Sequence, residues 1–278
     1  MTTNDAIRYV GLDEARGQSG LRLVLLSDVP SPWSDSAKDF FRLKKIPFVA
    51  VRYRPSDDAI RQWTGVHNAP VALYNDEPAL SHWGDLLALA ERLERRRPLI
   101  PVDLEGRIRM LGLCHEVMGP LGLVWHTRLM LLDVSLKTGG KCGFPLRLAE
   151  FLSRKYGYGQ QPIETSHHRV QEILVKLATL RELNRELEPN FILGEQLTAL
   201  DIYCAAALGV MALLPDEQCP LQPAMRLIFE SAAKEIKWAI PETLLAHRNI
   251  VRMQLAAQDS VDEYAGHEAV LAVALGRL

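Results

Sequence analysis

Cysteine is scarce in this chain, since its 278 residues include only Cys114, Cys142, Cys204 and Cys219. No two of them form a C-x-x-C pair, and their spacing does not match that of a zinc site. So few thiols in so long a chain also argue against a disulfide framework and favour a reducing compartment. The sequence therefore predicts neither a metal centre nor structural disulfides.

An excess of charge of either sign is also lacking, because the formal net charge is only −2. Such a balance provides no basic field for nucleic acid and no polybasic signal for a membrane surface. One short basic run at residues 92–97 fits a solvated helix end, since cations suit a helix C-terminus. We expect a protein that binds neither nucleic acid nor a membrane.

Long hydrophobic runs are absent as well. No stretch approaches the length of a membrane span, and the polar N-terminus has no apolar signal-peptide core. Together with the use of cysteine, these absences predict a soluble cytoplasmic protein.

Alternating strand and helix patterns occupy residues 21–97. Hydrophobic residues make up 48% of the chain, which is enough for a sizeable core. The order of the patterns predicts one small α/β domain. Its expected strands are Leu21–Leu26, Phe48–Tyr53, Val71–Tyr74 and a short fourth strand near Pro78–Ser81, with helices from Ser34, over Asp57–Thr64 and over Trp83–Leu93.

The character of the chain changes after a proline-containing linker at residues 98–103. Strand signals fade there, so residues 104–278 are predicted to form an all-helical domain. Residues 1–20 lack clear periodicity, and we expect them to form a flexible arm. The expected helices of the second domain are Leu104–Val117, Leu121–Leu136, His167–Leu187, Thr198–Leu213, Leu221–Lys237 and Val261–Leu275.

The motif VPSPWSDSAK joins the first predicted strand to the first predicted helix. Ser34 is placed to cap that helix, and Asp35 suits the positive end of its dipole. Capping alone does not require Ser31 and Trp33 just before it. A helix N-terminus beside a hydroxyl also favours an anion and lowers the pKa of a nearby thiol. The thiol would come from a ligand, because the motif contains no cysteine.

Two further motifs have local structural meanings. HNAPVALY places Pro70 directly before a strand, where it has no N–H for the ladder. A cis bond between Ala69 and Pro70 would expose the Ala69 backbone, although trans is the commoner isomer of X-Pro bonds. In GEQLTALDIYCAAAL, Thr198 and Asp201 form a capping box before an apolar helix, and we interpret this box as structural.

These three motifs, in this order, resemble the glutathione S-transferase family. The resemblance extends from Leu21 to the helix after Thr198. It implies an α/β thioredoxin-like N-terminal domain over residues 21–97, followed by an all-α C-terminal domain, which is the glutathione S-transferase fold. Shorter stretches such as PWSDSAK, WTG, NAPVALY, LALAERL and GLCHEV are similar to a bacterial subgroup of glutathione S-transferase-like proteins.

The resemblance also implies roles for individual residues. Ser31 takes the position of the active-site hydroxyl that hydrogen-bonds the glutathione sulfur, and Ser34 is the second choice. Trp33 would form a wall of the site. Ala69 and Pro70 match the residues whose backbone pairs with the cysteinyl part of glutathione, as an added strand would. Cis geometry at Pro70 is then expected.

The sequence departs from the family at LSHWGDLLAL, where family members commonly have Glu-Ser to bind the γ-glutamyl end of glutathione. Either Ser81 and His82 or His82 and Trp83 occupy these positions, and Asp85 lies one turn further on. Ser81 or His82 could still hydrogen-bond a carboxylate.

On the second helix of the C-terminal domain, Arg128 could meet an acidic substrate or form a surface salt bridge.

Two functional hypotheses follow. The first is a glutathione S-transferase-like enzyme that activates glutathione, its co-substrate, for attack on a small electrophile. The alternative is a non-catalytic module of the same fold for ligand binding or protein association, which the missing Glu-Ser pair supports. A thiol reductase is disfavoured, because Ser31 and Ser34 stand where such enzymes carry cysteine. The resemblance further implies a homodimer.

Overall fold

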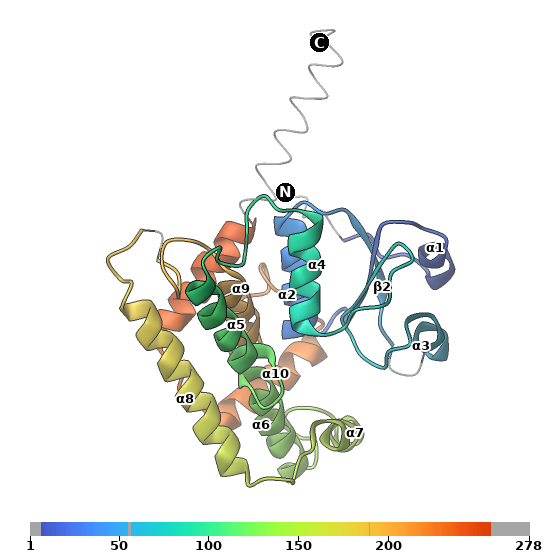
Figure 1. The fold of residues 1–278 in the computed structure, drawn as a ribbon. Helices are drawn as coiled ribbons and strands as arrows, with labels where there is room; N and C mark the ends of the chain where they lie inside the picture. Colours follow the sequence, from blue (N-terminus) through green and yellow to red (C-terminus); the bar gives the residue numbers. More distant parts are fainter. Residues whose placement is uncertain (1–6, 55–56, 189, 257–278) are drawn as a thin grey trace.

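The computed structural model describes residues 7–54, 57–188 and 190–256, which form an N-terminal half with a small sheet and a helical C-terminal half (Figure 1). In chain order the elements are α1 (Leu12–Arg16), β1 (Leu21–Leu25), α2 (Pro32–Leu43), β2 (Phe48–Arg52), α3 (Asp58–Thr64), β3 (Val71–Tyr74), α4 (Trp83–Leu93), α5 (Leu104–Met118), α6 (Leu123–Lys137), α7 (Leu146–Tyr156), α8 (Ile163–Glu182), α9 (Ala199–Met211) and α10 (Pro223–Ile236). Residues 242–256 are also helical.

The sheet has three strands in the order β2-β1-β3. β1 pairs in parallel with β2, where Leu21 faces Phe48, and antiparallel with β3, where Leu21 faces Tyr74. All five residues of β1 are buried, as its nearly continuous apolar pattern requires of a strand covered on both faces. The central strand of the sheet is therefore the first one predicted from the sequence.

The expected fourth strand near Pro78–Ser81 is reduced to a single bridge. The Ala72 N–H donates to the Leu80 carbonyl at 2.8 Å, and the Leu80 N–H donates back at 2.9 Å. The prediction of a strand is wrong because Pro78 has no N–H to extend the ladder, and the chain then turns at once into α4.

Residues 7–20 correct the expectation of a flexible arm over residues 1–20. The Val10 N–H donates to the Ala50 carbonyl at 2.8 Å, and the Ala50 N–H donates to the Arg8 carbonyl at 3.0 Å. α1 follows this pairing, and its Ala15 is fully buried against a cluster that includes Val24. The helix was missed because five residues are too few to show a helical period.

α2 and α4 lie between the sheet and the helical half, whereas α1 and α3 lie on the other side of the sheet (Figure 1). The residues of β1 explain this layering, because successive side chains of a strand point to opposite faces. Leu23 and Leu25 belong to the same core cluster as Phe40 of α2. Val24 instead packs with Ile60 of α3.

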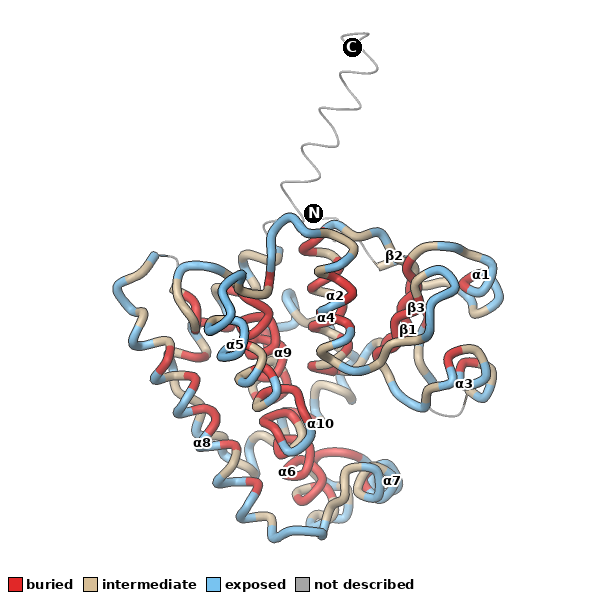
Figure 2. The backbone as a smooth tube through the Cα atoms, viewed as in Figure 1, coloured by how far each residue is buried: buried red, intermediate tan, exposed pale blue. Residues whose placement is uncertain are grey.

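α9 is the central helix of the C-terminal half, and its tube is almost continuously buried in Figure 2. Every residue of α9 except Gly209 is buried, as expected for a helix that is apolar on all sides. The predicted capping box is confirmed, since the N–H and the hydroxyl of Thr198 both donate to Asp201 at 2.8 Å. Within the part of the chain that the structure describes, no helix has the length and apolar character needed to cross a bilayer.

Five of the predicted helices of this half correspond to α5, α6, α8, α9 and α10, with shifts of a few residues at their ends. α7 was not predicted, because it buries only Ala149 and lies between two glycine-containing loops. The helical stretch at 242–256 was not predicted either. The expected helix Val261–Leu275 lies outside the described residues.

Candidate functional site

The mouth of α2 is capped by Ser31 and not by Ser34. The Ser31 Oγ accepts a hydrogen bond from the Ser34 N–H at 3.4 Å, and the Ser31 N–H donates to Asp35 Oδ2 at 3.0 Å. The prediction that Ser34 caps the helix is therefore wrong. The helix starts earlier because Pro32 occupies its first position, where a fixed φ suits the helix and the missing N–H does no harm.

The side chain of Ser34 connects α2 to the end of β1 by a hydrogen bond. Its Oγ accepts from the Leu26 N–H at 3.2 Å, and the residue has no exposed surface. Ser31 is also enclosed, with 1% of its surface exposed. Among the described residues, no acceptor takes the hydroxyl proton of Ser31. The hydroxyl of Ser31 can therefore donate to a ligand, once the ligand reaches it.

The electrostatics of the helix mouth include a negative and a positive side chain. Asp35 Oδ1 lies 2.7 Å from the Lys38 Nζ, and its other oxygen accepts from Ser31. Burial lowers the pKa of Lys38, but the carboxylate of Asp35 outweighs it, and the pKa is raised overall. An anion that bound at this mouth would lie near a carboxylate that Lys38 already balances.

The peptide bond between Ala69 and Pro70 is cis, which confirms the expectation drawn from the family resemblance. Pro70 is buried, and Ala69 is half-buried. Neither the N–H nor the carbonyl of Ala69 forms a hydrogen bond with another residue of the described ranges. The Ala69 backbone can therefore pair with an extended ligand.

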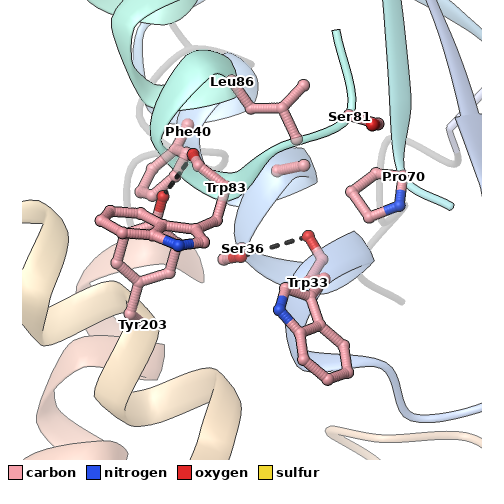
Figure 3. A pocket seen from close by; sticks show the side chains of 9 residues that line it. Trp33, Ser36, Phe40, Pro70, Ser81, Trp83, Leu86 and Tyr203 are labelled. Carbon is pink, nitrogen blue, oxygen red and sulfur yellow. Dashed lines mark hydrogen bonds between the residues drawn. The ribbon is translucent and has the colours of Figure 1, made fainter. Parts of the chain in front are cut away.

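A small cavity lies beside Pro70, between the N-terminal ends of α2 and α4 (Figure 3). Its volume is about 10 Å³, which is room for about one water molecule. The Trp33 indole N–H donates to the Met118 carbonyl at 3.0 Å, and the Tyr203 hydroxyl donates to the Trp83 carbonyl at 2.9 Å. The lining residues are Trp33, Ser36, Ala37, Phe40, Pro70, Ser81, Trp83, Leu86 and Tyr203.

The start of α4 has a histidine cap at the position where the family resemblance led us to look for a Glu-Ser pair. The Nδ1 of His82 accepts from the Gly84 N–H at 3.2 Å, and its ring centre lies 5.1 Å from that of Trp83. His82 is exposed, whereas Ser81 is half-buried and lines the cavity. The structure thus gathers Trp33, Pro70 and Ser81 around one cavity, and neither Ser31 nor Ser34 lines it.

Tyr203 is a cavity residue that sequence reasoning missed. It lies on α9, which was interpreted as purely structural, and its ring meets Phe40 edge-on at 4.9 Å. A tyrosine within an otherwise apolar helix is the sequence signal that could have pointed to this residue, because a buried tyrosine hydroxyl usually donates to an acceptor. Among the residues that the structure describes, no three His, Cys, Asp or Glu side chains gather as metal ligands do.

Comparisons with known proteins bear on the fold. No protein-family model matches the sequence, and no curated protein does. A glutathione transferase family member from Pseudomonas fluorescens Pf-5, crystallised with two glutathione bound, has a TM-score of 0.50 and 14% identity, covering 83% of this chain and 92% of that chain.

Two further crystal structures are similar to the same extent. A glutathione S-transferase from the Antarctic clam Laternula elliptica has a TM-score of 0.50 and 12% identity, covering 82% of this chain and 92% of its own. A possible glutathione S-transferase from Rhodopseudomonas palustris has a TM-score of 0.50 and 13% identity, covering 79% of this chain and 94% of its own. The chain therefore has the glutathione S-transferase fold, as its motifs predicted. It combines an α/β thioredoxin-like N-terminal domain with an all-helical C-terminal domain.

Proposed function

We propose that the chain is a glutathione-dependent transferase that uses the Ala69 backbone to hold the cysteinyl part of glutathione. The observation that carries this proposal is that the N–H and the carbonyl of Ala69, beside the cis bond to Pro70, have no partner in residues 7–54, 57–188 and 190–256. A peptide that pairs with them adds a short strand at the edge of the sheet. The Pseudomonas fluorescens protein of the same fold, crystallised with two glutathione bound, supports this choice of ligand.

The proposed chemistry is attack by the glutathione thiolate on a small electrophile. The Ser31 hydroxyl donates a hydrogen bond to the sulfur, and the N-terminus of α2 adds a favourable field, so that the thiol loses its proton to solvent more readily. The sulfur lone pair then forms the new carbon–sulfur bond, and the leaving group departs with its electron pair. Since only 1% of the surface of Ser31 is exposed, glutathione reaches this hydroxyl only when the side chains that cover it move apart.

Turnover of chlorodinitrobenzene with glutathione tests the role of Ser31. Ser31→Gly removes the hydroxyl and retains most of the capping energy, because glycine caps a helix nearly as well as serine. We expect kcat/KM to fall about tenfold or more, as for the loss of other hydrogen bonds to a developing anion. Ser36→Ala is the matched control, because this hydroxyl lines the cavity but donates to the Pro32 carbonyl at 2.7 Å. Equal rates in Ser31→Gly and the wild type would remove Ser31 from the mechanism.

A second candidate function is the non-catalytic module of the same fold. The observation that favours it is the closed helix mouth, where Ser31 is 1% exposed and Asp35 already supplies an anion. Calorimetric titration with glutathione separates the two functions. Heat that saturates below millimolar glutathione supports the transferase, whereas no heat at all supports the module.

A further inference from the structure

A peptide that pairs with Ala69 extends past both neighbours of that residue, Asn68 and Pro70. Because a strand rises about 3.3 Å per residue, the groups on either side of a bound cysteine lie beside these two positions. Asn68 is exposed, whereas Pro70 lines the cavity between α2 and α4. The polar groups near Asn68 and near Pro70 therefore decide which ends a bound thiol can have.

At the Pro70 end, the polar side chains are hydrogen-bond donors. Ser81 and Trp83 line the cavity beside Pro70 (Figure 3). Neither the Ser81 hydroxyl nor the Trp83 indole N–H has an acceptor among the described residues. No acidic residue of the described ranges lines this cavity. This end of the site can therefore donate to a carboxylate, but it offers no counter-ion to an ammonium group.

The N-terminus of α4 acts in the same direction. The Nδ1 of His82 accepts from the Gly84 N–H at 3.2 Å, so the ring proton lies on Nε2, which is a further donor. The positive end of the helix dipole also favours an anion. Asp85, in the first turn of α4, is exposed and does not line the cavity.

A cation lies at the Asn68 end. The Lys155 Nζ donates to Asn68 Oδ1 at 2.6 Å and forms no ion pair with a carboxylate of the described residues. Loss of solvent around the ammonium lowers the pKa of Lys155, and the positive charge of Arg128 lowers it further. A carboxylate bound beside Asn68 would provide the counter-ion that Lys155 lacks among these residues.

Arg128 adds to the positive field at this end. Only 8% of the residue is exposed, and its guanidinium carbon lies 5.9 Å from the ring centre of Tyr156, which the Lys155 Nζ approaches to 5.8 Å. Arg128 forms no hydrogen bond and no ion pair with any residue of the described ranges. The surface salt bridge considered from the sequence is therefore not formed with these residues.

We propose that the thiol which this site binds best carries a carboxylate at each end and no ammonium group. One carboxylate accepts from Ser81 and Trp83, and the other pairs with Lys155. Glutathione has both carboxylates, but its ammonium group loses water without gaining a counter-ion, which is unfavourable. The inference rests on the proposed function, because it takes the cysteinyl part of the thiol to pair with Ala69.

Calorimetry with three thiols tests the preference. Glutaryl-cysteinylglycine is glutathione without the amino group, and 4-aminobutyryl-cysteinylglycine is glutathione without the carboxylate of the γ-glutamyl end. We expect the glutaryl compound to bind about tenfold more tightly than glutathione, and the aminobutyryl compound about tenfold more weakly. Glutathione that binds as tightly as the glutaryl compound, or an aminobutyryl compound that binds as tightly as glutathione, would overturn the proposal.

Two variants test the groups at the two ends. Ser81→Ala and Lys155→Met should each weaken the glutaryl compound about tenfold, because each removes a partner of one carboxylate. The aminobutyryl compound keeps only the glycine carboxylate, so it should lose affinity in only one of the two variants, which shows the direction of the peptide. Unchanged affinity for the glutaryl compound in either variant would contradict the assignment.

Matched controls are available for both positions. Ser36 lines the same cavity, but its hydroxyl already donates to the Pro32 carbonyl at 2.7 Å, so Ser36→Ala should leave all three affinities unchanged. Arg154 is an exposed cation of α7, as Lys155 is, but it forms no hydrogen bond with Asn68. Arg154→Met should therefore have no effect either, and a loss equal to that in Lys155→Met would reduce the role of Lys155 to unspecific attraction and refute it.

Asp85→Asn tests whether the ammonium group has a partner on α4. We expect this variant to bind glutathione and the aminobutyryl compound as the wild type does. Weaker binding of these two, with the glutaryl compound unaffected, would show that Asp85 pairs with the ammonium group and would overturn the proposal.

Turnover of chlorodinitrobenzene separates a failure of this preference from a failure of the proposed function. With each thiol the sulfur bonds to the ring carbon, chloride leaves with the electron pair and the thiol proton goes to solvent. Tight binding of the glutaryl compound without turnover of any of the three thiols would refute the transferase and retain the preference. Turnover and affinity that both favour glutathione would refute the preference and retain the transferase. No heat with any of the three thiols would refute both.

Discussion

At the scale of the residue, burial shifts the pKa values of two side chains that lie next to each other inside the helical half, Asp201 and His247. Asp201 and His247 have no exposed side-chain surface, and the Nε2 of His247 lies 3.3 Å from Asp201 Oδ1. Burial raises the pKa of Asp201 to about 6, although hydrogen bonds from Ile192 and Thr198 oppose the shift. Burial also lowers the pKa of His247 to about 3. The histidine is therefore neutral in the folded protein at neutral pH.

His247→Asn should change how stability depends on pH. The pKa of His247 is lowered from 6.5 to about 3, so between these values the unfolded chain binds a proton that the folded chain does not. This contribution lowers the free energy of unfolding as pH falls, by up to about 1.4 kcal/mol per pH unit. The raised pKa of Asp201 has the opposite effect on the free energy of unfolding between about pH 6 and pH 3.8, because there the folded chain binds a proton that the unfolded chain does not. The variant loses only the first contribution and so gains stability relative to the wild type as the solution becomes acidic.

Urea unfolding of both proteins at about pH 7 and about pH 5 measures this difference. The difference in unfolding free energy between wild type and His247→Asn should shift in favour of the variant at the lower pH. Parallel pH dependence of the two proteins would show that the histidine does not lose its proton on folding.

At the scale of the element, the ends and bends of the helices use side chains that the periodic pattern does not reveal. The Ser135 Oγ donates to the Leu131 carbonyl at 2.6 Å and accepts from the Phe144 N–H at 2.8 Å. One hydroxyl thus ties the loop after α6 back onto the helix. Gly143 lies against it with a φ of +79°, which only glycine adopts readily.

Two glycine-to-alanine substitutions should change the free energy of unfolding in opposite directions. Gly112 lies in the middle of α5, and a Cβ added there meets nothing within 4 Å. We expect Gly112→Ala to raise the free energy of unfolding by about 1 kcal/mol, because alanine favours a helix interior. Gly143→Ala should lower it by about 2 kcal/mol or more, because the new Cβ collides with the Ser135 Oγ at a positive φ. Chemical denaturation measures both, and a stabilising Gly143→Ala would contradict the assigned role of that turn.

At the scale of the whole molecule, the two halves share the main hydrophobic core. The main core cluster includes Phe40 of the N-terminal half and Tyr203 of the C-terminal half. Polar contacts cross the same boundary: Trp33 bonds the Met118 carbonyl, and Arg252 lies 2.8 Å from Asp39. The closed site therefore depends on how the halves pack together, and not on the N-terminal half alone.

Unfolding should be a single cooperative transition, because separating the two halves divides the main core cluster. Far-ultraviolet circular dichroism and tryptophan fluorescence should give the same midpoint. Tyr203→Phe removes the hydrogen bond to the Trp83 carbonyl and should lower the free energy of unfolding by about 1 kcal/mol. The midpoints of the two signals should therefore fall together. Two separated transitions, or a shift of only one signal, would show that the halves unfold independently.

The sequence by itself determined the features that depend on a few neighbouring residues. The apolar run at Leu21–Leu26, the box at Thr198 and Asp201 and the change to helical periods after residue 103 predicted the fold class correctly. Such patterns work because the period of a strand, the face of a helix and its caps are set by side chains within one or two turns. Ser34 was misplaced as a cap because two serines stand three residues apart, and only the start of the helix distinguishes them.

The tertiary structure alone decided which of these residues are accessible and which charges are paired. Ser31 and Ser34 are both enclosed, and Lys155 contacts Asn68, which is 87 residues away in the chain. No local pattern marks Arg128 as a buried cation that has no counter-ion among the described residues, because its surroundings depend on what α7 and the α6–α7 loop place around it. Burial and charge pairing arise from contacts between distant segments, so they become visible only when the chain is folded.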